Sequence, residues 1–320
     1  MSRNFLVTRI VDLAIVLVGV SMLTFLMIRL VPGDAVAIML GANAEVTVER
    51  MNELRARLGL DQPIPVQYAQ WLANALRGEF GNSLWTGKPV VQEIAVHLPP
   101  TLQLAGLSLL LGAGLAVPLG VAMARLRGGW RETALQIASV VGLTVPSFWL
   151  GIMMILALTS FAPELQLLGY VPFTEDPAGN IARLLLPAIA LALPILANLA
   201  RLVRSAMLDA LAQDYVRTAR AKGVSERSVL FKHALRNALI PFVTSVGIMT
   251  GYLLGGAIVV EQVFAIPGLG RLILGAISER NYPLLQTAIL LVTFGFVLVN
   301  FAVDLLYAVI DPRVRLEADS

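Results

Sequence analysis

The sequence predicts an all-α polytopic membrane protein with six transmembrane helices. Of its 320 residues, 57% are hydrophobic and only 14% are charged, and the mean hydropathy is +0.78. A soluble domain carries about 25% charged residues, so this composition is typical of a membrane protein. Apolar runs of about 20 residues, the length that crosses a bilayer as a helix, recur along the chain.

Six apolar runs define the predicted spans. They are Ile10–Val31, Thr101–Ala124, Thr133–Ala162, Leu184–Ala200, Asn237–Val260 and Tyr282–Val303. The first run is longer than the apolar core of a signal peptide and no small-x-small cleavage site follows it, so we expect an uncleaved anchor. The fourth run contains Pro187 and Pro194, which membrane helices tolerate because neighbouring groups satisfy the freed carbonyls.

The distribution of Lys and Arg predicts the orientation. Most of the 24 basic residues fall in segments that face the cytoplasm if both termini lie inside. The short loop Arg125–Arg131 and the segment 201–236 are basic, whereas the loop after the third span carries Glu164, Glu175 and Asp176. Because basic loops stay on the cytoplasmic side, we expect a multi-pass protein of the inner (plasma) membrane with cytoplasmic termini.

The spans divide the chain into four parts. These are an N-terminal segment with the first span (1–31), an extracytoplasmic helical insertion (32–100), a transmembrane core (101–312) and a cytoplasmic tail (313–320). In the insertion, Thr47 can cap a helix over Val48–Leu58. Apolar residues at helical spacing predict a second helix that begins at Pro65 and ends at Gly78.

The residues needed for chemistry are missing from the sequence. There is no cysteine, and the two histidines, His97 and His233, are far apart. The segment Gly81–Lys88 has the wrong glycine spacing for a phosphate-binding loop, and Pro89 follows it instead of Ser or Thr. We therefore expect no catalytic, cofactor-binding or metal-binding residues, no enzyme activity and no nucleic-acid partner.

One candidate site is the basic segment between the fourth and fifth spans. It has helical spacing, and small residues stand where a cytoplasmic partner can approach closely. The residues assigned to it are Asp214, Tyr215, Arg217, Thr218, Ala219, Arg220, Ala221, Lys222, Gly223, Val224 and His233. A segment that is only a topology signal would show the same charge, so this alternative stays open.

A second candidate site follows the fifth span. Its residues are Glu261, Phe264, Pro267, Gly268 and Gly270. The glycines permit a tight turn beside the membrane. Two interpretations remain: an ordinary interhelical loop, or a re-entrant piece that lines the outer mouth of a pathway.

Seven short motifs occur in order along almost the whole chain: Leu58–Pro63, Gly78–Ser83, Asp214–Gly223, His233–Ala238, Pro267–Arg271, Asn281–Pro283 and Asn300–Arg313. Together they resemble those of the inner-membrane permease subunits of ABC importers for dipeptides, oligopeptides and nickel. The family's general coupling motif begins Glu-Ala-Ala, and this chain departs from it with Arg217-Thr218-Ala219.

The resemblance implies a function and a set of partners. It implies a permease subunit that forms a translocation pathway with a second, similar permease. Two cytoplasmic ATPases would bind ATP and magnesium and dock on the basic segment, and an extracytoplasmic binding protein would deliver the substrate. The alternatives are a secondary carrier or channel without ATPase partners, and an interaction-only scaffold. The sequence does not identify the substrate, for which peptides, nickel chelates and glutathione all fit.

Overall fold

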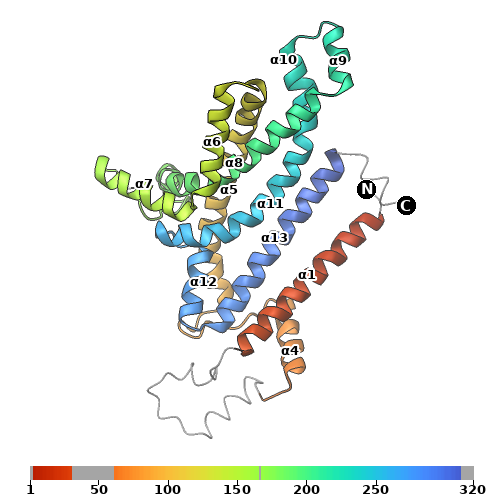
Figure 1. The fold of residues 1–320 in the computed structure, drawn as a ribbon. Helices are drawn as coiled ribbons and strands as arrows, with labels where there is room; N and C mark the ends of the chain where they lie inside the picture. Colours follow the sequence, from red (N-terminus) through yellow and green to blue (C-terminus); the bar gives the residue numbers. More distant parts are fainter. Residues whose placement is uncertain (1–2, 31–60, 166, 311–320) are drawn as a thin grey trace. The chain divides into compact units, whose positions relative to one another are not determined.

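The computed structural model describes residues 3–30, 61–165 and 167–310, which form helices joined by short connections (Figure 1). The helices are α1 (Arg3–Leu30), α4 (Ile64–Leu76), α5 (Val90–Arg125), α6 (Trp130–Thr144), α7 (Ser147–Phe161), α8 (Pro177–Leu211), α9 (Asp214–Ala221), α10 (Glu226–Ser228), the π-helix η1 (Val229–Ala234), α11 (Leu235–Val263), α12 (Leu269–Ser278) and α13 (Tyr282–Ile310). These ranges contain no strand, which confirms the all-α prediction for the described residues. The helix expected over Val48–Leu58 and the tail 313–320 lie outside them.

Length and composition identify three to five candidate membrane spans among the described residues. The helices α5, α8 and α13 are each long and apolar enough to cross a membrane. Two bent segments raise the number to five: α6 with α7, and the segment that contains α11. The apolar part of α1, Val11–Met27, is shorter. The count of six spans therefore stays a prediction.

The third predicted span, Thr133–Ala162, is wrong as a single straight helix. The chain turns by 99° between α6 and α7. Val145 leaves the helical conformation with ψ of 121°, because the ring of Pro146 disfavours a helical residue before it. Pro146 also has no N–H to continue the helix, so α7 begins afresh at Ser147.

The fourth predicted span, Leu184–Ala200, is too short. The helix α8 begins at Pro177, where the Asp176 side chain accepts a hydrogen bond from Gly179 N at 2.9 Å, and it continues to Leu211. It passes through Pro187 and Pro194 without ending. Much of α8 is buried, so its packing against neighbouring helices stabilises it although each proline removes one backbone hydrogen bond.

The chain forms two compact units. The first comprises 1–7, 99–271 and 296–320, and the second comprises 8–98 and 272–295. The core of the first unit consists of buried side chains from α5, α8 and α11. Its fully buried large residues include Leu104, Met123, Ile195, Leu199, Met207 and Leu253.

Glycines allow close helix packing at some of these contacts. A Cβ atom at Gly112 of α5 would lie 2.9 Å from the Ile195 side chain of α8, and one at Gly120 would lie 2.6 Å from the Ala200 carbonyl oxygen. A Cβ atom at Gly247 of α11 would likewise lie 2.8 Å from the Val303 side chain. By contrast, Gly114 of α5 has no neighbour within 4 Å, so packing does not require glycine there.

In the second unit, α4 packs against α1 through aromatic residues. The buried ring of Phe25 lies 5.3 Å from Tyr68 and 5.9 Å from Trp71, centroid to centroid. The Tyr68 hydroxyl also shares a 2.8 Å hydrogen bond with Ser21 Oγ. The helix predicted from Pro65 is thus confirmed with small differences at its ends, and Gly78 follows it with φ of +83°.

The same unit joins two segments that are distant in sequence. Asn281 donates a hydrogen bond to Ser83 Oγ at 2.8 Å and accepts one from Leu84 N at 3.2 Å. Trp85 Nε1 donates to the Glu279 carbonyl oxygen at 2.8 Å. These bonds hold the segment after α4 against the turn between α12 and α13.

Candidate functional site

The basic segment forms a compact helical projection. In Figure 1, α9 and α10 extend beyond the ends of α8 and α11. Gly223 joins α9 to α10 with φ of +76°, a left-handed conformation that glycine adopts without steric cost. No atom lies within 4 Å of the position that a Cβ would take there, so this glycine is required by the backbone and not by neighbours.

The projection has its own small apolar core. Val216 and Val229 are fully buried, Ala219 is 9% exposed, and Leu211 and Val224 pack against them. Ala219 therefore does not lie on an exposed face, contrary to our expectation that its small size serves a partner. A larger residue at Ala219 would disturb the packing of α9 on η1.

The outer face of α9 is polar and exposed. Thr218, Ala221 and Lys222 are exposed, together with Arg217, which contacts Asp214 at 3.4 Å. Arg220 donates two hydrogen bonds to Glu226, at 3.1 Å from Nε and 2.7 Å from Nη2, and these bonds raise the pKa of Arg220. Exposed pairs of this kind stabilise by only about 0.2–1 kcal/mol, so they leave the charges available to a partner.

Two other assigned residues lie where the projection meets α11. Tyr215 is 41% exposed, and its hydroxyl accepts a 2.7 Å hydrogen bond from Asn237 Nδ2. His233 is half-buried within η1, and its carbonyl oxygen accepts from the same amide at 3.3 Å. The π-helical turn therefore lies at the connection between the projection and α11.

The second candidate segment is held by a buried carboxylate. Glu261 is 0% exposed and lies near the end of α11. Its Oε1 accepts a hydrogen bond from Thr101 Oγ1 of α5 at 2.6 Å, and its Oε2 accepts one from Arg271 N at 3.2 Å. Thr101 Oγ1 in turn accepts from Leu269 N at 2.7 Å. Thr101 and Glu261 together satisfy backbone donors that the start of α12 leaves free.

The loop itself leaves room for this carboxylate. A Cβ at Gly268 would overlap the carboxyl group of Glu261, and one at Gly270 would lie 2.5 Å from Ile258 Cα. Phe264 is 2% exposed and packs over Gly151 of α7. Gly268 and Gly270 thus lie against Glu261, while Phe264 packs on α7.

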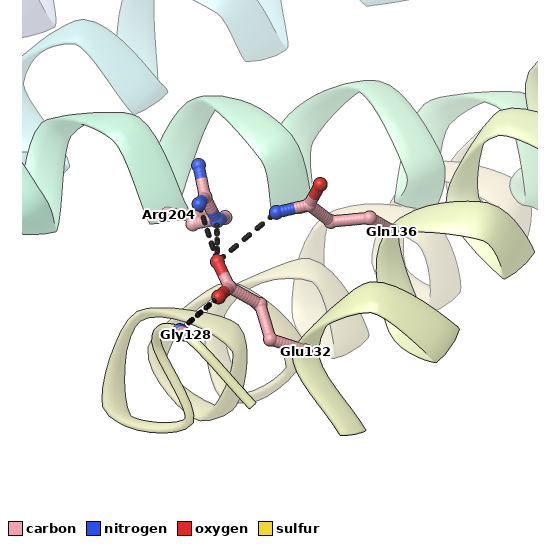
Figure 2. Close-up of polar contacts among 4 residues, drawn as sticks. All are labelled: Gly128, Glu132, Gln136 and Arg204. Atoms are coloured by element: carbon pink, nitrogen blue, oxygen red, sulfur yellow. Dashed lines mark hydrogen bonds and ion pairs between the residues drawn. The ribbon is translucent and has the colours of Figure 1, made fainter. Parts of the chain in front are cut away.

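An ion pair joins α6 and α8, and the sequence patterns did not predict it. Figure 2 shows Glu132 of α6 surrounded by Gly128, Gln136 and Arg204. Its Oε1 accepts from Arg204 Nε at 2.7 Å and from Gln136 Nε2 at 3.0 Å, and also contacts Arg204 Nη2. Its Oε2 accepts from Gly128 N at 2.6 Å. The only sequence signal was a single acidic residue directly after a basic loop.

Among the described residues, no group of three or more His, Asp or Glu side chains is placed to hold a metal ion. The fold and its segments define a helical membrane protein with a basic projection and a loop held by a buried carboxylate.

Comparison with known proteins identifies the family. Residues 116–316 match the family described as binding-protein-dependent transport system inner membrane component, and residues 1–105 match its N-terminal region. The chain belongs to this family. It is a transmembrane permease subunit of an ATP-driven importer and a multi-pass protein of the inner membrane.

Relatives match over nearly their whole length. The chain is 43% identical over 318 residues to a protein of Brucella melitensis described as a peptide transport system permease, which covers 99% of this chain and 100% of the relative. It is 39% identical over 312 residues to a glutathione transport system permease protein of Salmonella choleraesuis, covering 98% and 99%.

A solved structure shares the fold. The structure of the MetNI methionine ABC transporter in an inward-facing conformation contains a chain that superposes with a TM-score of 0.57 at 19% identity. The superposition covers 70% of this chain and 98% of that one. It supports an ABC permease fold for the helical core.

Proposed function

We propose that this permease and a second, homologous permease subunit form a pathway for peptides or related small solutes. Two cytoplasmic ATPases would supply ATP hydrolysis with magnesium, and an extracytoplasmic binding protein would deliver the solute. The substrate class rests on the peptide and glutathione permeases that the chain resembles. The projection Asp214–Ala234 carries the proposal, because it is basic, exposed and held together by its own core.

In this mechanism the projection is the coupling element. The packing of Val216 on Val229 makes α9 move together with η1, and η1 continues directly into α11. Closure of the ATPases would push on α9, and the push would reach the pathway through α8 and α11. At the other end of α11, Glu261 ties the helix to α5 and α12, so we propose that this loop closes the outer mouth.

Bulk on the exposed face of α9 should block ATPase docking. Ala221→Trp adds a large ring at an exposed position without backbone strain, and Gly223→Trp adds bulk and strain together. Overpacking a contact costs about 1–3 kcal/mol, which corresponds to a loss of about 5- to 150-fold in association. We expect both variants to insert in the membrane but to lose co-purifying ATPase and solute uptake.

Two conservative variants control for this test. Ala221→Ser keeps the size, and Gly223→Asn keeps a residue that tolerates the left-handed conformation. Both should retain at least partial uptake. Normal uptake by a well-expressed Ala221→Trp protein would mean that the segment is only a topology signal.

Orientation can be tested with single cysteines, because the chain has none of its own. Asn82 and Ser225 are both exposed. We expect Asn82→Cys to react with a membrane-impermeant maleimide in intact cells and Ser225→Cys to react only after permeabilisation. The opposite labelling pattern would reverse the proposed orientation.

The alternative is a secondary carrier or channel that works without ATPases. The lack of charged residues in the second and third predicted spans disfavours ion-coupled transport. Purification from native membranes separates the two, since an importer subunit should bring ATPase subunits with it. Solute uptake by the reconstituted chain alone, without ATP, would support the carrier.

A further inference from the structure

A hollow between α6 and α8 combines basic, polar and apolar side chains. Its volume is about 510 Å³, within the range of ligand pockets. From α6 it is lined by Gln136, Val140 and Leu143, and α8 contributes Asn198, Arg201, Leu202, Arg204 and Ser205. On α8, the positions 198, 201, 202 and 205 have the spacing of one helix face. The hollow is thus a groove between two packed helices, lined by both.

The two arginines in the hollow differ in their partners. Arg204 is bound to Glu132, and the same carboxylate holds the amide of Gln136 (Figure 2). Glu132 therefore fixes one wall of the hollow and neutralises one of its two positive charges. Arg201 is exposed, and the part of the chain that the structure describes offers it no ion-pair partner. The hollow carries one net positive charge and hydrogen-bond donors from Asn198 and Ser205.

The position of the hollow along α6 corresponds to the membrane interface. Trp130, the first residue of α6, is 77% exposed, and the Arg131 guanidinium lies 5.7 Å from its ring. Trp is enriched at the membrane–water interface. Gln136 follows six residues later, about 9 Å along the helix. The basic loop Arg125–Arg131 precedes it, so in the proposed orientation the hollow begins near the inner-leaflet headgroups and extends along α6 toward the hydrocarbon core.

The surface beside the hollow is apolar. Val140 is 51% exposed and lines the hollow, and Ile137 and Val141 next to it on α6 are 59% and 53% exposed. An anion held at Arg201 would therefore continue into a surface suited to hydrocarbon. A free solute carboxylate has no hydrocarbon chain to contact this surface, whereas a phospholipid has both a charged headgroup and a hydrocarbon chain.

We propose that this hollow binds the phosphate headgroup of an anionic phospholipid from the inner leaflet. Arg201 would pair with the phosphate, Asn198 and Ser205 would donate hydrogen bonds, and an acyl chain would lie along Val140. Basic pockets between membrane helices on the cytoplasmic side bind anionic headgroups. The lipid would brace α6 against the part of α8 that leads into the projection. This inference rests on the proposed orientation.

The test measures lipid binding without transport, so its failure is distinct from failure of the importer function. The full-length protein is purified in detergent with any subunits that accompany it and titrated with palmitoyl-oleoyl phosphatidylglycerol or phosphatidylcholine. Bound lipid is counted by native mass spectrometry. We expect preference for phosphatidylglycerol, weakened about tenfold by Arg201→Gln, as for loss of one charge-assisted hydrogen bond.

Two further variants separate the hollow from general surface charge. Ser205→Phe fills the hollow at unchanged charge and should weaken phosphatidylglycerol binding as well. Arg127→Gln removes an exposed charge from the neighbouring loop without touching the hollow, and should leave binding unchanged. Melting temperatures close to that of the unsubstituted protein show that each variant is folded.

Three outcomes would overturn the proposal. The first is equal binding of the two lipids, and the second is an equal loss in Arg127→Gln and Arg201→Gln. The third is displacement of phosphatidylglycerol by millimolar inorganic phosphate, which would identify a soluble anion as the occupant of the hollow.

Discussion

Replacing Glu261 with alanine is expected to destabilise the protein by about 3–5 kcal/mol and to abolish uptake. The carboxylate is fully buried and accepts hydrogen bonds from Thr101 and Arg271. Removing it leaves the Thr101 hydroxyl and the Arg271 amide without this acceptor, at about 1–3 kcal/mol for each buried group. It also opens a cavity under the Gly268 turn. The melting temperature of the detergent-solubilised protein measures the loss.

Two glycines of the same region provide matched variants. Gly268→Ala places a methyl group against the Glu261 carboxyl group and should destabilise the loop strongly. Gly275→Ala in α12 meets no atom within 4 Å and has no left-handed backbone. Because alanine favours a helix over glycine, it should stabilise by about 0.5–1 kcal/mol. Equal melting temperatures for the two variants would contradict the proposed role of Glu261 in holding the loop.

Part of the fold follows from local patterns and part depends on packing. The helix α4 was predictable because Tyr68 and Trp71 have helical spacing between Pro65 and Gly78. The positions of the prolines did not predict where helices end. Pro146 ends a helix with a 99° turn, whereas Pro187 lies buried inside α8, which continues past it. Tertiary contacts decide whether a proline ends a helix or lies inside it, and these contacts cannot be predicted from the local pattern of one sequence.

The candidate sites also combine local sequence properties with contacts between residues that are distant in the sequence. The basic character of α9 is a local property, and the sequence indicated it. The burial of Ala219 depends on Val229 in another helix, and the pairing of Glu132 with Arg204 joins residues 72 positions apart. Glu261 was selected for its place after a span, but its contact with Thr101, 160 positions away, explains its burial. Non-local partners of polar residues were the part that sequence patterns missed.

The second large effect is expected where α5 crosses α8. Gly120→Ala should destabilise the protein by about 1–3 kcal/mol, toward the upper end of that range, and reduce uptake. Its Cβ would lie 2.6 Å from the Ala200 carbonyl oxygen and 2.6 Å from Val203 Cβ. Neither atom can move by a side-chain rotation, so the two helices must separate. The helix α8 leads directly into the projection Asp214–Ala234, so a shift of its axis would displace α9 as well.

Gly114 of the same helix is the control. It lies in α5 with no neighbour within 4 Å, so Gly114→Ala adds the same methyl group and should leave melting temperature and uptake unchanged or slightly improved. Adding Val203→Ala to Gly120→Ala should not restore function, because the carbonyl oxygen and the Cβ at position 203 both remain. Equal melting temperatures for Gly120→Ala and Gly114→Ala would mean that α5 and α8 do not approach as closely as the structure shows. Restored function on adding Val203→Ala to Gly120→Ala would mean the same.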